Sequence, residues 1–242
     1  MKLACASSAL HRAIERGDLT QLEFLDLCAH ELACDGVVLD VRHFPRTDGD
    51  YLAQVKKMAA DRGLTLAAVT APGFFEGTDA DISAMLGCAA AIGAPIFAGT
   101  LARETDRSWS EQLERLWAAS ALAKSANVTL AVRNAPGTFA AATHDCKRVA
   151  KETDSAWLRF GPEPRAFDAA SDPADLAANT VLLWSNVGDE TERSIGDVIR
   201  GFSAFRGHLA LDEPSGDAAV ADLRDGLRSW RIALAELQRL RA

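Results

Sequence analysis

The sequence lacks the features that mark secreted and membrane-spanning proteins. Its five cysteines are an odd number at irregular spacing with no C-x-x-C pair, which is typical of unpaired thiols in a reducing compartment. No stretch reaches the roughly 18 consecutive apolar residues of a membrane-spanning helix. The N-terminal segment also lacks the long apolar core of a secretory signal. We therefore expect a cytoplasmic protein with no membrane partner.

Positive charge is scarce as well. The chain has 26 Lys and Arg against 34 Asp and Glu, a formal net charge of −8 at pH 7. An acidic surface repels the phosphate backbone, so we expect no nucleic-acid partner. The sequence also contains no P-loop, no G-x-G-x-x-G, no H-E-x-x-H and no G-x-S-x-G, the motifs of several large enzyme classes.

Short apolar runs alternate with longer amphipathic stretches along the whole chain. The step between runs averages about 29 residues, which is enough for one strand, one helix and two loops. Several runs are apolar throughout, as at 181–184, which is typical of strands buried on both faces of a parallel sheet. The runs are 2–6, 36–41, 65–69, 94–98, 129–132, 158–160, 180–184 and 207–211.

The stretches between the runs have helical spacing. Two of them open with a capping box, Thr20 to Glu23 and Ser108 to Glu111. The last carries one apolar stripe, Leu223, Leu227, Trp230, Leu234 and Leu237. Eight βα units predict a single-domain α/β protein, a (β/α)₈ TIM barrel over 1–242. A doubly wound open sheet is the alternative, but it needs fewer strands and usually carries a glycine-rich first turn.

In a barrel of this kind, function lies at the C-terminal ends of the strands. The residues there are polar, mixed in sign and interleaved with aromatics, which suits a small sugar or polyol ligand. We expect the largest concave site to contain Asp40, Arg133, Glu163, Trp184 and Asp212. The full set of candidates is His11, Asp40, His43, Arg133, Asn134, Glu163, Trp184, Ser185 and Asp212. Trp184 is either a stacking platform for a sugar or a plug for the barrel.

Four segments carry a resemblance to a known family. They are 35–40 with His43-Phe44-Pro45 behind it, 130–134, 158–164 and 207–212. In this order the chain resembles the sugar phosphate isomerase/epimerase family, the xylose-isomerase-like TIM barrels. The resemblance implies a divalent metal held by Glu, Asp, His and Glu at the ends of strands five to eight, with two carboxylates acting as acid and base.

At the corresponding positions this chain offers Arg133, Glu163, Trp184 or Ser185, and Asp212. Two of four ligand positions keep a carboxylate, and a guanidinium cannot bind a cation because it has no free lone pair. We therefore predict that no metal or other cofactor is bound. Arg133 is either a structural bridge between the two acids or an anion-binding group.

Two functions remain open from the sequence. The first is an isomerase or epimerase of a small sugar, sugar phosphate or related hydroxy-keto compound. Asp212 and Glu163 would transfer the proton, and Arg133 would polarise the carbonyl or hold a phosphate. Substrate contacts would come from Asn134, His11, Asp40, His43, Trp184 and Ser185. The alternative is a non-catalytic, metal-free barrel that binds a sugar or an anion.

Overall fold

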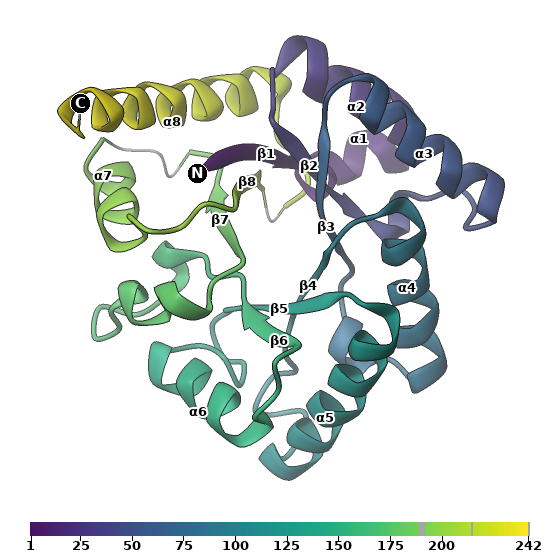
Figure 1. The fold of residues 1–242 in the computed structure, drawn as a ribbon, viewed down its shortest axis with the longest axis vertical. Helices are drawn as coiled ribbons and strands as arrows, with labels where there is room; N and C mark the ends of the chain where they lie inside the picture. The colour runs from purple at the N-terminus through teal and green to yellow at the C-terminus, as the bar shows by residue number, and fades with distance from the viewer. Residues whose placement is uncertain (189–191, 214, 242) are drawn as a thin grey trace.

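The computed structural model describes residues 1–188, 192–213 and 215–241. Eight strands form one parallel sheet in the order β6-β5-β4-β3-β2-β1-β8-β7, which curls into the barrel of Figure 1. The strands are β1 (Lys2–Ala6), β2 (Gly36–Asp40), β3 (Thr65–Thr70), β4 (Ile96–Thr100), β5 (Thr129–Arg133), β6 (Leu158–Phe160), β7 (Leu182–Asn186) and β8 (His208–Asp212). The prediction of an eight-stranded α/β barrel is confirmed.

The barrel has a seam between β6 and β7. The other neighbouring strands pair in parallel ladders, with one register shift between β2 and β3, but β6 and β7 meet at a single bridge between Phe160 and Thr180. Two backbone hydrogen bonds flank it, from Val181 N–H to the Phe160 carbonyl (2.9 Å) and from Trp184 N–H to the Pro162 carbonyl (3.0 Å). Because β6 has only three residues, these few bonds close the barrel.

Helices cover the outside of the barrel. They are α1 (His11–Glu15), α2 (Gln21–Asp26), α3 (Gly49–Asp61), α4 (Asp79–Ile92), α5 (Trp109–Ala126), α6 (Thr143–Thr153), α7 (Glu192–Gly201) and α8 (Val220–Arg241). Both predicted capping boxes are present, at the starts of α2 and α5. Thr78 and Asp81 form a further one at the start of α4. The short sixth unit forms only a 3₁₀ helix over Pro173–Asn179.

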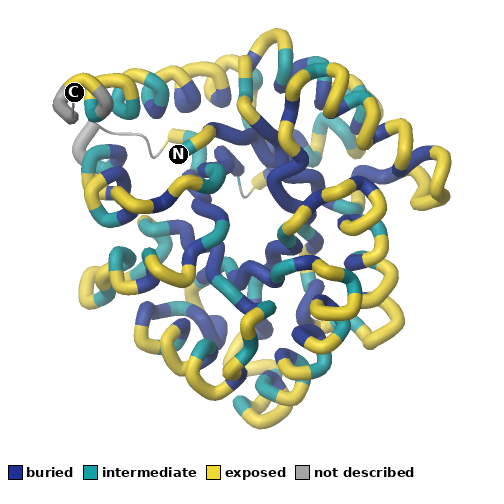
Figure 2. Tube along the Cα trace, in the orientation of Figure 1, coloured by how far each residue is buried: buried dark blue, intermediate teal, exposed yellow. Residues whose placement is uncertain are grey.

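Two apolar cores result from this arrangement. The larger one lies between the sheet and the helices, so buried residues follow the strands and exposed residues follow the outer helix faces (Figure 2). The smaller one fills the barrel interior, and most of its side chains are alanines: Ala4, Ala6, Ala67, Ala68, Ala98, Ala131 and Ala210. Alanine side chains are small and leave space in the centre of a barrel. The indole of Trp184, which is 1% exposed, occupies this space.

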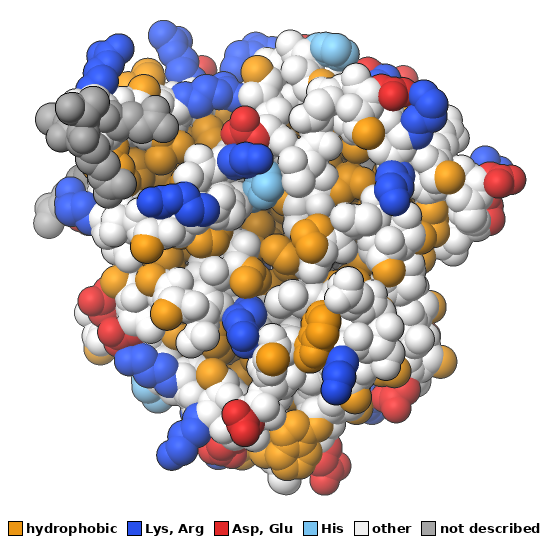
Figure 3. Space-filling view, viewed as in Figure 1, with side chains coloured by type: hydrophobic (Ala, Val, Ile, Leu, Met, Phe, Trp, Pro, Cys, Tyr) orange, Lys and Arg blue, Asp and Glu red, His pale blue; other side chains and the backbone are white. Residues whose placement is uncertain are grey.

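The surface is mixed in character. Figure 3 shows acidic and basic side chains interspersed with apolar ones over one face of the molecule. Among the described residues, no helix combines the length and the apolar composition needed to cross a bilayer.

Candidate functional site

Arg133, at the end of β5, is the centre of a buried polar cluster. Its NH1 group donates to Asp212 Oδ2 at 2.5 Å, and its NH2 group donates to Glu163 Oε2 at 2.7 Å and Asn186 Oδ1 at 3.3 Å. The side chains of Arg133, Glu163 and Asp212 are 17%, 8% and 5% exposed. We call these four residues the arginine cluster. One guanidinium thus joins the ends of β5, β7 and β8 and the loop after β6.

Each carboxylate in the arginine cluster is also held by a second group. Asn186 Nδ2 donates to Glu163 Oε1 at 2.5 Å. Asp212 Oδ1 accepts from the Ser8 hydroxyl at 2.7 Å and from the Glu213 backbone N–H at 2.9 Å. Every oxygen of both carboxylates therefore accepts at least one hydrogen bond.

The charge of Arg133 is secured by its surroundings. Burial alone would lower the pKa of Arg133, but the nearby Asp212 and Glu163 carboxylates outweigh burial and raise it above its usual range. The guanidinium carbon also lies 4.3 Å from the centre of the Trp184 ring, which is the geometry of a cation–π contact. Arg133 is thus a fixed cation above the barrel interior.

Asn134 acts on the backbone. Its Nδ2 donates to the Glu163 carbonyl at 3.1 Å, and its Oδ1 accepts from the Glu163 N–H at 2.7 Å. These two hydrogen bonds hold the backbone of Glu163 just after β6 and so orient the Glu163 side chain towards Arg133. Asn134 is 2% exposed, and both polar atoms of its side-chain amide take part in these two hydrogen bonds.

Trp184 and Ser185 lie in different surroundings. Leu182 and Trp184 face the barrel interior, whereas Leu183 belongs to the outer core. Since strand residues alternate between faces, Ser185 shares the outer face with Leu183. The inward position beyond Trp184 is Asn186. Trp184 plugs the barrel interior, and Arg133 covers its ring.

A second group of polar residues lies at the ends of β1 and β2. The Ser7 hydroxyl lies 2.8 Å from His43 Nδ1, and His43 Nε2 lies 2.9 Å from His11 Nδ1. Arg42 NH1 lies 3.3 Å from His11 Nε2, and Arg42 also pairs with the buried Asp40 at 2.6 Å. We call these five residues the histidine cluster. It meets the arginine cluster through the adjacent residues Ser7 and Ser8.

The contact with Arg42 fixes the protons of both histidines. Arg42 can only donate, so His11 Nε2 must accept, and neutral His11 carries its proton on Nδ1. That proton is donated to His43 Nε2, and His43 Nδ1–H is then donated to Ser7. Asp40 N–H also donates to the Ser7 hydroxyl oxygen, at 2.9 Å. Ser7 thus joins His43 to the backbone at the end of β2.

We predict that His43 makes the stability of the protein dependent on pH. Burial lowers the pKa of His43 to about 4, despite the raising effect of Asp40, and His11 and Arg42 lower it further. Between pH 6.5 and about 4 the unfolded chain binds the extra proton. The contribution of His43 to the free energy of unfolding should therefore be fully present above pH 6.5. It should fall as the pH drops to about 4, by up to about 1.4 kcal/mol per pH unit. Denaturant unfolding from pH 7 to pH 4.5 measures this loss.

The control for this prediction is another histidine. His43→Gln should reduce the difference in unfolding free energy between pH 7 and pH 4.5, and the remainder includes His208, whose pKa is also lowered by burial. His30→Gln removes a side chain that is 71% exposed and should retain the wild-type pH dependence. Identical pH profiles for His43→Gln and the wild type would show that His43 does not carry the effect.

The cavities lined by described residues only partly match the predicted pocket. Glu163 and Trp184 border a cavity of about 10 Å³, together with Ser185, Asn186 and others. A cavity of about 430 Å³ lies next to it, between the loop after β6 and α7, and another of about 440 Å³ lies between the loops after β7 and β8 and α8. Asp40, Arg133 and Asp212 line none of these three cavities, because ion pairs enclose their side chains. The expectation of one large pocket with all five residues is not confirmed.

The arginine cluster does not fit a divalent metal. In the part of the chain that the structure describes, no three His, Cys, Asp or Glu side chains gather in a way that could hold a metal ion. The two carboxylates at the barrel mouth instead share Arg133. A cation placed between them would be repelled by the guanidinium.

Sequence reasoning identified most of these residues but missed several partners. Asn186, Ser7, Ser8 and Arg42 bind the predicted residues directly. The strand-end rule does mark Ser7, Arg42 and Asn186, although none of them is among the site candidates, and Ser8 directly follows Ser7. Nothing in the sequence shows which strand-end residue pairs with which, because that depends on the twist of the sheet.

Comparison with known proteins supports the fold. No protein-family model matches the sequence, and no curated protein sequence matches it. Solved structures do match. D-psicose 3-epimerase with D-tagatose from Clostridium cellulolyticum H10 is 12% identical, with 99% of each chain covered and a TM-score of 0.75. The probable 3-DHS dehydratase AsbF from Bacillus anthracis is 13% identical, with 94% of this chain and 98% of that chain covered and a TM-score of 0.77.

The 3-keto-D-glucoside 4-epimerase YcjR from E. coli is similar to the same degree. It is 13% identical, with 96% of this chain and 99% of that chain covered and a TM-score of 0.74. A xylose isomerase domain protein from Alicyclobacillus acidocaldarius also matches, with a TM-score of 0.76. The chain has the fold of the xylose-isomerase-like TIM barrels, as the sequence resemblance implied.

Proposed function

We propose that the protein is an isomerase or epimerase of a small hydroxy-carbonyl compound, such as a sugar, and that it works without a bound metal. The observation that carries the proposal is the position of Arg133 between Glu163 and Asp212 at the strand ends. A fixed cation flanked by two carboxylates supplies the groups that move a proton next to a carbonyl. The structural neighbours named as epimerases support the same reaction class.

In the proposed reaction Arg133 takes the role of electrophile. One of its N–H groups donates to the substrate carbonyl oxygen and stabilises the negative charge that develops there. Glu163 removes the proton from the neighbouring carbon, which gives an enediolate. Return of that proton to the former carbonyl carbon gives the isomer, while the hydroxyl proton passes to the former carbonyl oxygen. A solvent proton that reaches the original carbon from the side of Asp212 gives the epimer, and Glu163 then releases its proton to solvent. No oxidant or reductant is needed.

The two carboxylates differ in their capacity to act as a base. Asp212 Oδ1 accepts two hydrogen bonds, which uses both of its lone pairs. Glu163 accepts one hydrogen bond on each oxygen from a described residue and keeps a lone pair on each. Glu163 is therefore the better candidate for the base that removes the proton.

One observation favours a second candidate function, a non-catalytic sugar- or anion-binding barrel. Each carboxylate oxygen already accepts a hydrogen bond, and the cavity beside Glu163 has a volume of only about 10 Å³. In such a protein Arg133 would serve as a structural bridge. The two functions differ in whether a substrate carbon exchanges its proton.

Proton exchange is the direct test. Protein dialysed against EDTA and shown metal-free by elemental analysis is incubated in D₂O with D-fructose and other ketoses. We expect deuterium beside the carbonyl in the proton NMR spectrum. Glu163→Gln should lower the exchange rate by at least about 100-fold, because it removes the general base.

Glu114→Gln is the matched control, since Glu114 is exposed on α5 and far along the chain from the site. It should exchange at the wild-type rate. Binding of the ketoses without any exchange would support the non-catalytic barrel. Exchange that stops on EDTA treatment and returns with Mn²⁺ or Mg²⁺ would contradict the metal-free reaction.

A further inference from the structure

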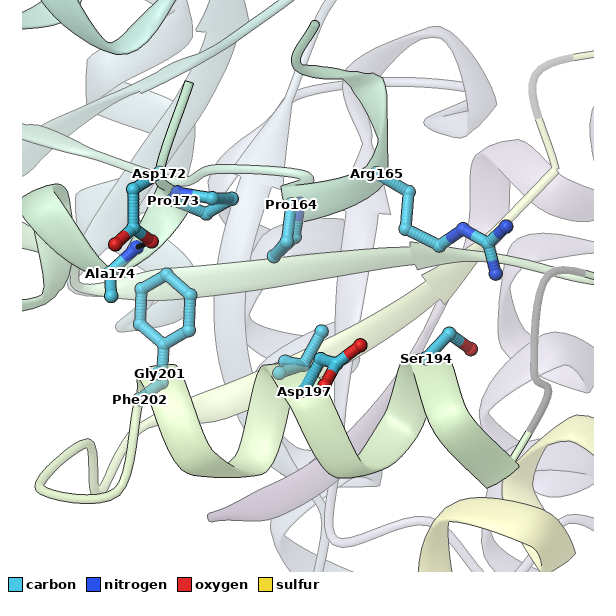
Figure 4. Close-up of a pocket in the computed structure, with 10 residues that line it drawn as sticks. Pro164, Arg165, Asp172, Pro173, Ala174, Ser194, Asp197, Gly201 and Phe202 are labelled. Carbon is cyan, nitrogen blue, oxygen red and sulfur yellow. Dashed lines mark hydrogen bonds between the residues drawn. The ribbon is translucent and has the colours of Figure 1, made fainter. Parts of the chain in front are cut away.

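A cavity of about 430 Å³ lies between the loop after β6 and α7, and we call it the β6–α7 cavity. Figure 4 shows its two walls: residues of the loop above, and residues along one side of α7 below. Its volume is within the range of small-molecule sites, roughly 300–1,000 Å³. The lining residues are Pro164, Arg165, Asp172, Pro173, Ala174, Ser194, Asp197, Val198, Gly201 and Phe202.

The walls combine apolar surface with carboxylates. Pro164 and Pro173 on the loop lie across the cavity from Phe202, which directly follows α7, and Asp172 and Asp197 add an acid to each wall (Figure 4). Val198 of α7 also lines the cavity. The helix residues recur every three or four positions, so one stripe of α7 faces the cavity. Gly201 completes this stripe, and a Cβ there would lie 3.4 Å from Ala174 Cβ, so the glycine lies where the helix and the loop approach each other.

The β6–α7 cavity adjoins the arginine cluster. It shares Pro164, Arg165, Ser194 and Val198 with the small cavity that borders Glu163, Trp184 and Asn186. A molecule whose reacting end lies at Glu163 would therefore extend into the larger space. A single monosaccharide bound at the arginine cluster would leave that space unused.

We propose that the substrate is a glycoside or disaccharide, whose reacting carbonyl end approaches Glu163 and whose second sugar ring occupies the β6–α7 cavity. This inference rests on the proposed function. Carboxylates accept hydrogen bonds from sugar hydroxyls, and proline and phenylalanine side chains pack against the C–H face of a sugar ring. The lining holds Asp172, Asp197 and Arg165, so it has no excess of positive charge that would favour an anion. Asp197 pairs with Arg200, which offsets the charge that would attract a compact cation, and each acid keeps lone pairs that can accept from neutral hydroxyls.

The test compares two sugars that share one reacting end. Isomaltulose carries a glucosyl unit on fructose, so calorimetric titration with isomaltulose and with D-fructose isolates the contribution of the second ring. We expect isomaltulose to bind at least about tenfold more tightly than D-fructose. Gly201→Leu should remove this preference, because its side chain fills the cavity, and should leave the affinity for fructose unchanged.

The control is the same substitution on the same helix. Gly196→Leu lies outside the cavity, and a Cβ there meets only the flexible end of Arg200, so it should keep the preference. If Gly201→Leu does not fold, Ala174→Leu fills the cavity from the loop, with the exposed Ala178→Leu as its control.

The outcomes separate this inference from the proposed function. Equal affinity of the wild type for the two sugars, or a preference that both cavity variants retain, overturns the second-ring site, even if D-fructose exchanges its proton in D₂O. A preference lost only in the cavity variants, without exchange on either sugar, keeps the binding site and overturns the reaction.

Discussion

Replacing Arg133 with methionine should destabilise the protein by about 3–5 kcal/mol. Methionine keeps much of the length of the side chain but removes the charge that Glu163 and Asp212 share. Both carboxylates are less than one-tenth exposed, so each would remain as an unpaired charge in a nearly dry site. Denaturant unfolding at pH 7 measures the change.

An exposed ion pair provides the comparison. Arg12 pairs with Asp217 at 3.0 Å, and both side chains are more than half exposed. Arg12→Met should therefore cost no more than about 1 kcal/mol. A similarly small loss for Arg133→Met would show that the arginine cluster does not support the barrel.

Replacing Trp184 with alanine should have an effect of similar size, about 3–5 kcal/mol, through packing. The indole fills the space that the interior alanines leave, and Gly161 allows it to fit, since a Cβ there would lie 3.2 Å from Trp184 Nε1. Neighbouring alanines are too short to close the gap. The variant should also increase the mobility of the Arg133 side chain, because it removes the cation–π contact with the indole ring.

Trp117→Ala is the matched change on the surface, where the side chain is 49% exposed. It should alter the unfolding free energy by no more than about 0.5 kcal/mol. Thermal and denaturant unfolding of both variants would test the comparison. A Trp184→Ala protein as stable as Trp117→Ala would mean that the barrel interior collapses around the missing ring.

The fold could be predicted because its strands are apolar on both faces and its helices are apolar on one. Eight apolar strand runs, most of them followed by an amphipathic helix, specify a parallel barrel. The weak pairing of β6 with β7 could not be predicted. It follows from the shortness of β6 and from Pro162, whose carbonyl accepts a hydrogen bond but whose nitrogen cannot donate one.

The site was predictable in position and not in detail. The strand-end rule selects Arg133, Glu163 and Asp212, which the structure brings together. The same rule selects Ser185, although Asn186 is the residue that contacts the arginine cluster. The run from Val181 to Trp184 is apolar throughout, so the sequence gives no alternation from which to assign the inward face.

The seam of the barrel has a consequence for how the chain can evolve. Glu163 stands on one side of the seam and Asn186 on the other, and their side chains bond across it at 2.5 Å. Few backbone bonds join β6 to β7, so residues that would handle a ligand also hold the two edges together. A substitution of Glu163 or Asn186 that suits a new ligand therefore also changes the stability of the barrel closure. Such a substitution needs compensating contacts elsewhere between β6 and β7.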